Sequence, residues 1–275
     1  MESKDLTVVI VTFKSDRKIF SCLNSISKDI KVLVVENSDS QSFKNQIEEK
    51  FSNVKCILTG SNNGYAVANN IGLKEVKTKF SLVLNPDTIL QSDTIKNFFD
   101  VTKKFPNFWL IGPYNNQSIK KEIDEEVINV KNLKGFAIFI NMEKFQDNFF
   151  DENYFLYFEE IDLCKKVKDN NGDIFLAKSI RIQHDSANSV NNGKFELEKN
   201  RNWHWMWSSF YFHKKHKGFF IALLIVIPKL ISCFIKIILY SILSDKEKKD
   251  IYYFRMSGLV NSIIGKKSWY RPSID

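Results

Sequence analysis

Short apolar runs rich in β-branched residues alternate with amphipathic segments through the first third of this chain. The segments between the runs, at 16–28 and 41–51, carry apolar residues close to helical spacing. Runs of this length and composition predict strands that are covered on both faces. The strand–helix–strand order predicts an α/β fold with a doubly wound, mostly parallel sheet. The four runs are Leu6–Thr12, Lys31–Val35, Val54–Leu58 and Phe80–Leu84.

The chain is predicted to divide at about residue 200, where the composition shifts to Trp, Phe, Ile and Lys. We expect an α/β domain over residues 1–200 and a basic, aromatic and helical region over residues 201–275. Within the first domain, the stretch from 105 to 132 is less regular. Helices are expected near 92–104 and within Tyr154–Lys168, and strands at Gly135–Ile140, Asp173–Ala177 and Ser179–Gln183.

With 275 residues, of which 44% are hydrophobic, the chain can bury a sizeable core and is not globally disordered. The four cysteines are scattered, without the spacing of a metal knuckle or a redox pair. They are expected to be buried thiols of a reducing compartment. The first residues run straight into a strand without the apolar stretch of a signal peptide, which predicts a cytosolic α/β domain.

A carboxylate follows the strand predicted at Phe80–Leu84. Asn85, Pro86 and Asp87 end this strand abruptly, because proline withdraws a backbone donor. Open α/β sheets bind ligands beyond the carboxyl ends of their strands, and a carboxylate there could ligate a hard divalent cation. All three residues also favour turns, so an ordinary turn is the alternative.

Polar residues also follow the strand predicted at Lys31–Val35. Glu36, Asn37 and Ser38 stand where the ligand crevice should lie, and Glu36 could accept hydrogen bonds from a pyrimidine ring or from ribose hydroxyls. A turn with a helix cap is the alternative, since serine is a good cap.

The segment from Asn62 to Gly72 is predicted to be a loop that enters a helix. Gly64, after Asn63, lets the chain turn and lets a backbone approach a ligand closely, and the helix start would favour phosphate. Asn69 and Asn70 are locally unfavourable inside a helix, which indicates a role beyond helix propensity.

An acidic cluster follows the aromatic stretch that begins at Tyr154. Glu159, Glu160 and Asp162 lie within four residues, and neighbouring acids raise one another's proton affinity, which suits a general base. Helical geometry places Glu159 and Asp162 on one side and Glu160 elsewhere. The alternative is an acidic first turn that the helix dipole favours.

A histidine, His184, follows the strand predicted at Ser179–Gln183. Histidine at a strand end could be a metal ligand or a diphosphate contact, and a structural histidine is the alternative.

Together these segments resemble family 2 glycosyltransferases, which are inverting enzymes of GT-A fold, and within them the bacterial rhamnosyltransferase-like branch. The resemblance covers roughly residues 6–190 and keeps the family's order. The residues that carry it are Val8–Thr12, Val34–Ser38, Asn62–Gly72, Leu84–Asp87, Phe155–Cys164 and His184.

The resemblance implies roles for individual residues. Asp87 corresponds to the last acid of the family's Asp-x-Asp metal motif, and His184 to a histidine that helps hold the metal diphosphate. The cofactor it implies is Mg²⁺ or Mn²⁺. Glu160 falls at the catalytic base, with Glu159 as the alternative because a glutamate replaces the usual aspartate. The nucleotide-sugar donor would contact Thr12, Glu36, Asn37, Ser38, Asn63, Gly64, Asn69, Asn70 and Asn85.

By resemblance the donor is expected to be dTDP-rhamnose, with a UDP-hexose or UDP-HexNAc as the alternative. Two other functional classes fit the sequence less well. A nucleotidyltransferase would need a Gly-rich basic loop after the first strand, and Thr12–Arg17 has no glycine. A catalytically silent membrane scaffold of a glycan assembly complex is disfavoured, because Asp87, Glu160 and His184 are all retained.

The net positive charge of the chain is concentrated in the tail. Residues 199–275 hold 14 Lys/Arg against 4 Asp/Glu, whereas the net charge of the whole chain is only +8. Aromatic residues beside lysines are typical of a water–lipid boundary, and Phe219–Leu243 is long enough to span a membrane. Lys229 and Lys236 disfavour a clean span, so an interfacial or re-entrant pair of helices broken at Pro228 is expected.

This tail predicts a peripheral or monotopic protein on the cytoplasmic face of the bacterial inner membrane. The acceptor would then be a lipid-linked surface glycan, on a polyprenyl diphosphate carrier. A soluble helical cap or a homodimer interface is the alternative role of the tail. No nucleic-acid partner is expected, because the apolar run has no use in RNA binding.

Overall fold

The computed structural model describes residues 2–13, 16–114, 125–146, 149–184 and 194–271. The chain forms two compact units. One consists of Met1–Asp151 and Glu160–Ser189 and is called here the sheet unit. The other consists of Glu152–Glu159 and Val190–Asp275 and is called here the helical unit. Its long first helix passes through residue 200 without interruption. The functional division predicted at residue 200 stays a prediction.

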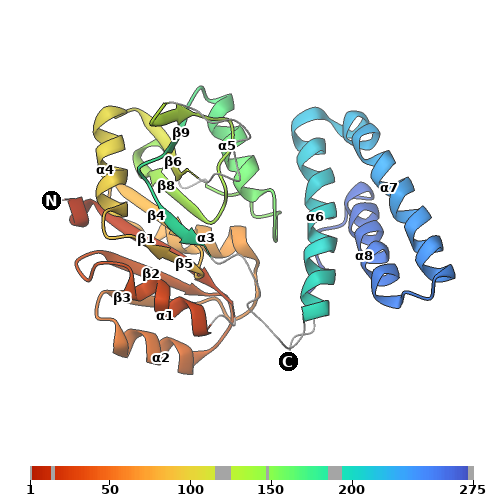
Figure 1. Cartoon of the computed structure of the whole chain (residues 1–275), viewed down its shortest axis with the longest axis horizontal. Helices are drawn as coiled ribbons and strands as arrows, with labels where there is room; N and C mark the ends of the chain where they lie inside the picture. The colour runs from red at the N-terminus through yellow and green to blue at the C-terminus, as the bar shows by residue number, and fades with distance from the viewer. Residues whose placement is uncertain (1, 14–15, 115–124, 147–148, 185–193, 272–275) are drawn as a thin grey trace. The chain divides into compact units, whose positions relative to one another are not determined.

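The sheet unit contains an eight-stranded, mostly parallel sheet with the strand order β3-β2-β1-β4-β8-β6-β9-β7 (Figure 1). Strands β8 and β7 run antiparallel to their neighbours. Two short strands, β5 (Thr88–Leu90) and β10 (Ile182–His184), pair with each other outside this sheet. The eight strands are β1 (Leu6–Thr12), β2 (Lys31–Glu36), β3 (Val54–Leu58), β4 (Phe80–Leu84), β6 (Phe108–Pro113), β7 (Val127–Asn129), β8 (Ala137–Asn141) and β9 (Asp173–Ala177).

Helices cover both faces of the sheet. One face packs against α1, α2 and α4 through a large apolar core that includes Val8, Val34, Leu82 and Phe139. Helix α3 covers the opposite face, where Ala68 packs on Val11 and Val35. The helices of this unit are α1 (Asp16–Asn24), α2 (Gln41–Lys50), α3 (Tyr65–Lys74), α4 (Thr94–Lys104) and α5 (Glu159–Asp169), with short 3₁₀ turns at Glu2–Asp5 and Met142–Lys144.

The predicted doubly wound, mostly parallel sheet is confirmed, because the first four strands pair in the expected parallel order. Sequence periodicity missed three strands, β5, β6 and β7. Two of them have only three residues, too few for a two-residue period to be visible. The third, β6, ends in Gly112-Pro113. Glycine and proline are unusual inside strands, so this run does not stand out as a strand in the sequence.

The helical unit is built mainly from three helices, α6 (Lys194–Lys217), α7 (Phe219–Ile242) and α8 (Lys246–Ile263). The predicted break at Pro228 is wrong, because α7 runs through this proline as one helix. Proline removes one helical hydrogen bond. Apolar contacts on both sides of it, through Ala222, Val226 and Cys233, bury one face of α7 and offset this loss.

Helices α6 and α8 approach so closely that only glycine fits at position 258. A Cβ atom on Gly258 would lie 2.2 Å from the Trp203 carbonyl oxygen, which belongs to the backbone and cannot rotate away. We expect Gly258→Ala to lower the free energy of unfolding of this unit by about 3 kcal/mol. Ser257→Ala, which removes a hydrogen bond to the Trp203 indole, should cost only about 1 kcal/mol. Equal thermal melting curves for the two variants would contradict the close approach.

Candidate functional site

The candidate site lies at the carboxyl edge of the parallel strands. Thr12 is paired with Glu36 across β1 and β2, and β4 ends on the same edge at Leu84, opposite Ile10. The antiparallel strand β8 starts at this edge, so the loop before it arrives there too: the Asn85 N–H donates to the Phe136 carbonyl (2.9 Å). The sheet therefore gathers segments that are far apart in the sequence.

Asp87 and His184 come together at this edge. Strands β5 and β10 pair with His184 opposite Thr88, the residue after Asp87. The His184 Nε2 atom lies 3.4 Å from the Asp87 Oδ1 atom, and each side chain is about one-fifth exposed. The imidazole also stacks on the Phe136 ring, with centroids 4.6 Å apart and the planes 7° from parallel. Both partners thus hold the histidine ring in one orientation beside the carboxylate.

This pair has the donor chemistry of a cation site that a ligand completes. Asp87 Oδ1 is buried and accepts no hydrogen bond within the described part of the chain. Nor do the described residues contain any group of three or more His, Cys, Asp or Glu able to hold a metal. Mg²⁺ sites are commonly built from one or two carboxylates together with substrate phosphates. Asp87 and His184 therefore fit a divalent ion whose remaining ligands come from a diphosphate.

Glu160 stands at the start of α5, against the loop that enters β8. A Cβ atom placed on Gly135 would lie 3.5–3.6 Å from the Glu160 side chain, at ordinary van der Waals distance, so the Glu160 side chain lies directly beside this residue. Burial raises the pKa of Glu160, and the Glu160 and Ile161 backbone N–H groups at the helix start act against this shift. A carboxylate with a raised pKa is a stronger base than an exposed one.

Glu159 differs from its neighbour in exposure. The Glu159 and Asp162 side chains are almost completely buried, whereas Glu160 is only partly buried. This agrees with the sequence argument that places Glu159 and Asp162 on one side of the helix. The residues before them, Tyr157 and Phe158, both have positive φ angles (69° and 71°). Such backbone is costly for side chains other than glycine and occurs often at functional sites.

Tyr65 links the two halves of this arrangement. Its hydroxyl lies within hydrogen-bond distance of the Gly135 carbonyl oxygen (2.9 Å) and the Asn85 side-chain oxygen (3.1 Å), which share its one donor proton. Asn85 lies two residues before Asp87, and Gly135 lies against Glu160. The Tyr65 side chain therefore connects the loop that holds Asp87 with the loop that contacts Glu160. In the sequence, Tyr65 stands out only as part of the Asn62–Gly72 motif, and no local signal indicates a role for Gly135 or Phe136. Their contribution depends on the loop before β8, whose position only the sheet pairing fixes.

On the neighbouring strands β1 and β2 of the same edge, Thr12 and Glu36 are buried polar residues. The Thr12 hydroxyl is buried and has no hydrogen-bond partner among the described residues, which is the expected state of a group that awaits a ligand. Glu36 accepts a hydrogen bond from Ser38. These positions are consistent with the predicted contacts to a nucleoside.

Several predicted donor contacts hold loops in place. The Asn37 amide binds Asn62 Oδ1 (3.1 Å) and the Gly64 carbonyl (3.2 Å), and its oxygen accepts the Asn63 N–H (3.0 Å). Asn70 makes two hydrogen bonds to the Phe150 backbone, of 2.8 and 3.0 Å. Both side chains are therefore engaged in positioning the chain. Their predicted direct contact with the donor stays a prediction.

Gly64 and Asn69 keep features that suit a ligand site. Gly64 has φ +88°, a conformation that other residues rarely adopt, and caps the start of α3. The Asn69 amide nitrogen bonds to the Tyr65 carbonyl (2.9 Å), whereas its side-chain oxygen is buried without a partner within the described residues.

Comparison with known families gives one match over most of the sheet unit. A sequence profile described as "Glycosyl transferase family 2" matches residues 7–165. This is more than half of the chain, and it contains every candidate site residue except His184.

Curated relatives are similar at low identity. The hexosyltransferase Agl10 of low-salt glycan biosynthesis in Haloferax volcanii is 23% identical over 220 residues, which is 70% of each chain. The rhamnosyltransferase WbbL of Escherichia coli is 26% identical over 55% of this chain and 71% of its own length. An N-acetylglucosaminyl-diphospho-decaprenol L-rhamnosyltransferase of Mycobacterium tuberculosis is 20% identical over 67% of this chain and 77% of its own.

Solved structures show the same fold. A mannosyltransferase from Pyrobaculum calidifontis, solved with GDP-Man and Mn²⁺, superposes with a TM-score of 0.60 at 11% identity, over 96% of this chain and 88% of that chain. The Staphylococcus aureus TarS fragment 1–349 superposes with a TM-score of 0.52 at 15% identity, over 97% and 93%. The expected GT-A fold is thereby confirmed. This chain is a glycosyltransferase that belongs to glycosyl transferase family 2.

Proposed function

We propose that this protein is an inverting, metal-dependent glycosyltransferase that moves rhamnose from dTDP-rhamnose to a lipid-linked glycan acceptor. The observation that carries the proposal is the gathering of the Asp87–His184 pair and Glu160 around one loop, through Phe136 and Gly135. Two relatives named as rhamnosyltransferases, at 26% and 20% identity, support the choice of sugar.

In the proposed reaction, Asp87 and His184 would hold a divalent ion. The ion would neutralise the charge that develops on the leaving nucleoside diphosphate. Thr12 and Glu36 bind the nucleoside, and the Tyr65 hydroxyl holds the Asn85 loop in position. Glu160 takes the proton of the acceptor hydroxyl as that oxygen attacks the anomeric carbon from the face opposite the leaving group, which inverts the configuration.

A donor screen tests this proposal. Purified protein is incubated with nucleotide sugars and Mn²⁺ or Mg²⁺, and the released nucleoside diphosphate is measured. We expect release from dTDP-rhamnose that EDTA abolishes. Preferential release from a UDP-hexose or UDP-HexNAc would reassign the donor. If no nucleotide sugar is turned over or bound, the protein is the catalytically silent scaffold of a glycan assembly complex.

We also infer that the helical unit associates with the cytoplasmic face of a bacterial inner membrane. Helix α7 is the candidate membrane segment, with 24 residues, a mean hydropathy of 2.4 over its most apolar window and only 17% of that window buried. Its exposed apolar residues face away from α6 and α8, and include Phe220 (80% exposed), Leu224, Ile231, Ile235 and Ile242. A contiguous exposed apolar face is typical of a membrane or protein contact. The predicted homodimer stays an alternative use of the same face.

A further inference from the structure

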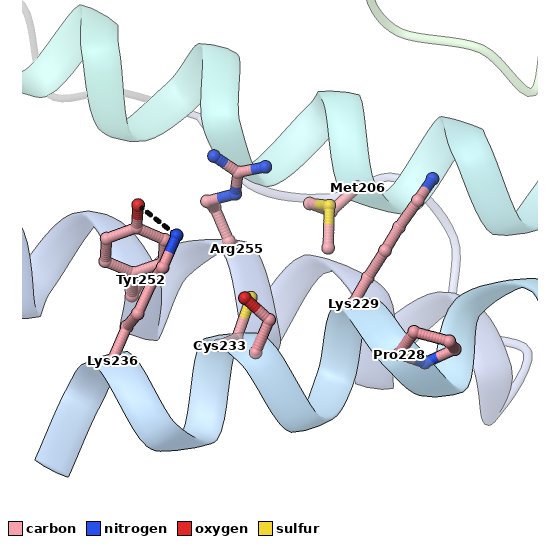
Figure 2. Close-up of a pocket in the computed structure, with 8 residues that line it drawn as sticks. Met206, Pro228, Lys229, Cys233, Lys236, Tyr252 and Arg255 are labelled. Carbon is pink, nitrogen blue, oxygen red and sulfur yellow. Dashed lines mark hydrogen bonds between the residues drawn. The ribbon is translucent and has the colours of Figure 1, made fainter.

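A pocket of about 230 Å³ lies within the helical unit, lined by residues of α6, α7 and α8 (Figure 2). Three cationic side chains extend into it: Lys229 and Lys236 from α7, and Arg255 from α8. Met206 of α6 and Pro228 of α7 form part of its apolar wall. All three cations are partly buried, in a region that the candidate active site does not use.

The three cations have only neutral partners among the described residues. The Lys229 ammonium donates to the Ser209 hydroxyl (2.9 Å), and the Lys236 ammonium to the Tyr252 hydroxyl (3.1 Å). The Nε atom of Arg255 is buried without a hydrogen-bond partner in the described residues. None of the eight lining residues, all of them described, is acidic.

This arrangement is electrostatically incomplete. Burying a charged group costs free energy unless an opposite charge or several hydrogen bonds compensate. Burial and the neighbouring Arg255 lower the pKa of Lys229, so the folded protein already resists this charge. A bound anion would reduce the repulsion among these cations and accept hydrogen bonds from their N–H groups. A guanidinium and two ammonium groups suit the several acceptor oxygens of a phosphate.

The outer face of α7 indicates where that phosphate comes from. Lys229 and Lys236 lie on the inner face of α7, in line with the buried Ala222, Val226 and Cys233. The opposite face of the same helix is apolar and exposed. The inner face of α7 therefore lines the pocket, while its outer face is suited to contact acyl chains. Basic pockets beside apolar membrane-contacting helices are typical binding sites for lipid headgroups.

We propose that this pocket binds the phosphomonoester headgroup of an anionic membrane lipid, while the outer face of α7 rests in the same leaflet. The proposal rests on the membrane association inferred above and adds a specific ligand site to it. The lipid phosphate would accept hydrogen bonds from Lys229 and Arg255, with Lys236 adding positive charge to the same pocket, so binding to vesicles depends on headgroup chemistry as well as on apolar contact.

The test measures binding of the full-length protein to vesicles by flotation. Vesicles of phosphatidylcholine alone are compared with vesicles that also contain phosphatidic acid. The double variant Lys229→Gln/Arg255→Gln should bind the phosphatidic acid vesicles at least about tenfold more weakly, because charge-assisted hydrogen bonds are lost. The matched control, Lys246→Gln/Lys267→Gln, removes the same formal charge from exposed positions and should bind markedly better.

Three further measurements separate the outcomes. Ile235→Glu, on the outer face, should lose binding to both kinds of vesicle, whereas Ile264→Glu, at an equally exposed isoleucine outside α7, should keep it. A short-chain phosphatidic acid below its micelle concentration should raise the melting temperature of the wild type but not of the pocket variant. Glycerol 3-phosphate should do so only at much higher concentration.

Equal losses in the pocket variant and its charge-matched control would overturn the pocket proposal and leave membrane association intact. Equal stabilisation by glycerol 3-phosphate and by the lipid would also overturn it, because the ligand would then be a soluble phosphate. If the wild type binds neither kind of vesicle, the inferred membrane association itself is wrong, and with it the lipid site.

Discussion

The variant Glu160→Gln is expected to transfer sugar about 10²–10⁴ times more slowly than the wild type, while it still binds the donor. Glutamine keeps the size of the side chain and its contact with Gly135 but cannot accept the acceptor proton. The measurement is the rate of glycosyl transfer, together with donor affinity by calorimetry. Loss of transfer with unchanged donor affinity identifies a group that acts in the chemical step.

Stability should not fall in this variant. Because burial raises the pKa of Glu160, the folded protein holds this proton more tightly than the unfolded chain. The resulting stabilisation is present at low pH and is lost as the pH rises through the raised pKa. Glutamine does not titrate, so at neutral pH Glu160→Gln should melt at the wild-type temperature or above it. The transfer rate of the wild type should rise with pH through the same raised pKa.

Glu159→Gln is the matched control, since it makes the same change one position earlier. We expect it to keep most of its transfer activity if it folds, because Glu159 is almost completely buried. A thermal melt separates loss of folding from loss of chemistry. Near-normal transfer by Glu160→Gln, together with an inactive but folded Glu159→Gln, would move the base to Glu159.

Asp87→Asn is expected to lower metal-dependent turnover of the donor at least about 10²-fold, since a metal that stabilises developing charge contributes several kcal/mol. Asparagine keeps the shape of the turn but removes the negative charge beside His184. The readouts are release of the nucleoside diphosphate as a function of Mn²⁺ concentration, and the melting temperature. Mn²⁺ with dTDP should raise the melting temperature of the wild type but not of the variant.

The control for this variant is Asp100→Asn on α4, a partly exposed aspartate that pairs with Lys103 in an ordinary surface ion pair. It should leave both readouts unchanged. Full Mn²⁺ dependence in folded Asp87→Asn would show that the ion, if used, binds elsewhere.

The sequence was most informative where signals are local. The strands Val54–Leu58, Phe80–Leu84 and Asp173–Ala177 have the predicted bounds, because each is a compact apolar run closed by polar or turn residues. The error at Pro228 has the opposite origin. Proline usually ends a helix, but α7 continues through Pro228 because its packing against α6 and α8 offsets the lost hydrogen bond.

The candidate site shows the same division. Asp87 and Glu36 could be singled out because each directly follows a predicted strand. The 3.4 Å approach of His184 to Asp87 could not be predicted, since the two residues are about 100 positions apart and meet only through the β5–β10 pairing. The hydrogen bonds by which Asn37 and Asn70 position loops could not be predicted either. The sequence does not show which side-chain amides bond to distant backbone groups in the folded chain.

By itself, the sequence determined the first four strands of the sheet and the helices between them, the carboxylates at the strand ends and the apolar length of α7. These follow from periodicity and turn chemistry, which act over a few residues. Only the tertiary structure decided which of these groups meet: Asp87 with His184, Glu160 with Gly135, and Lys229 with Arg255 in one pocket. The physical reason is that such meetings depend on strand register and on the packing of helix faces, which the whole chain fixes together.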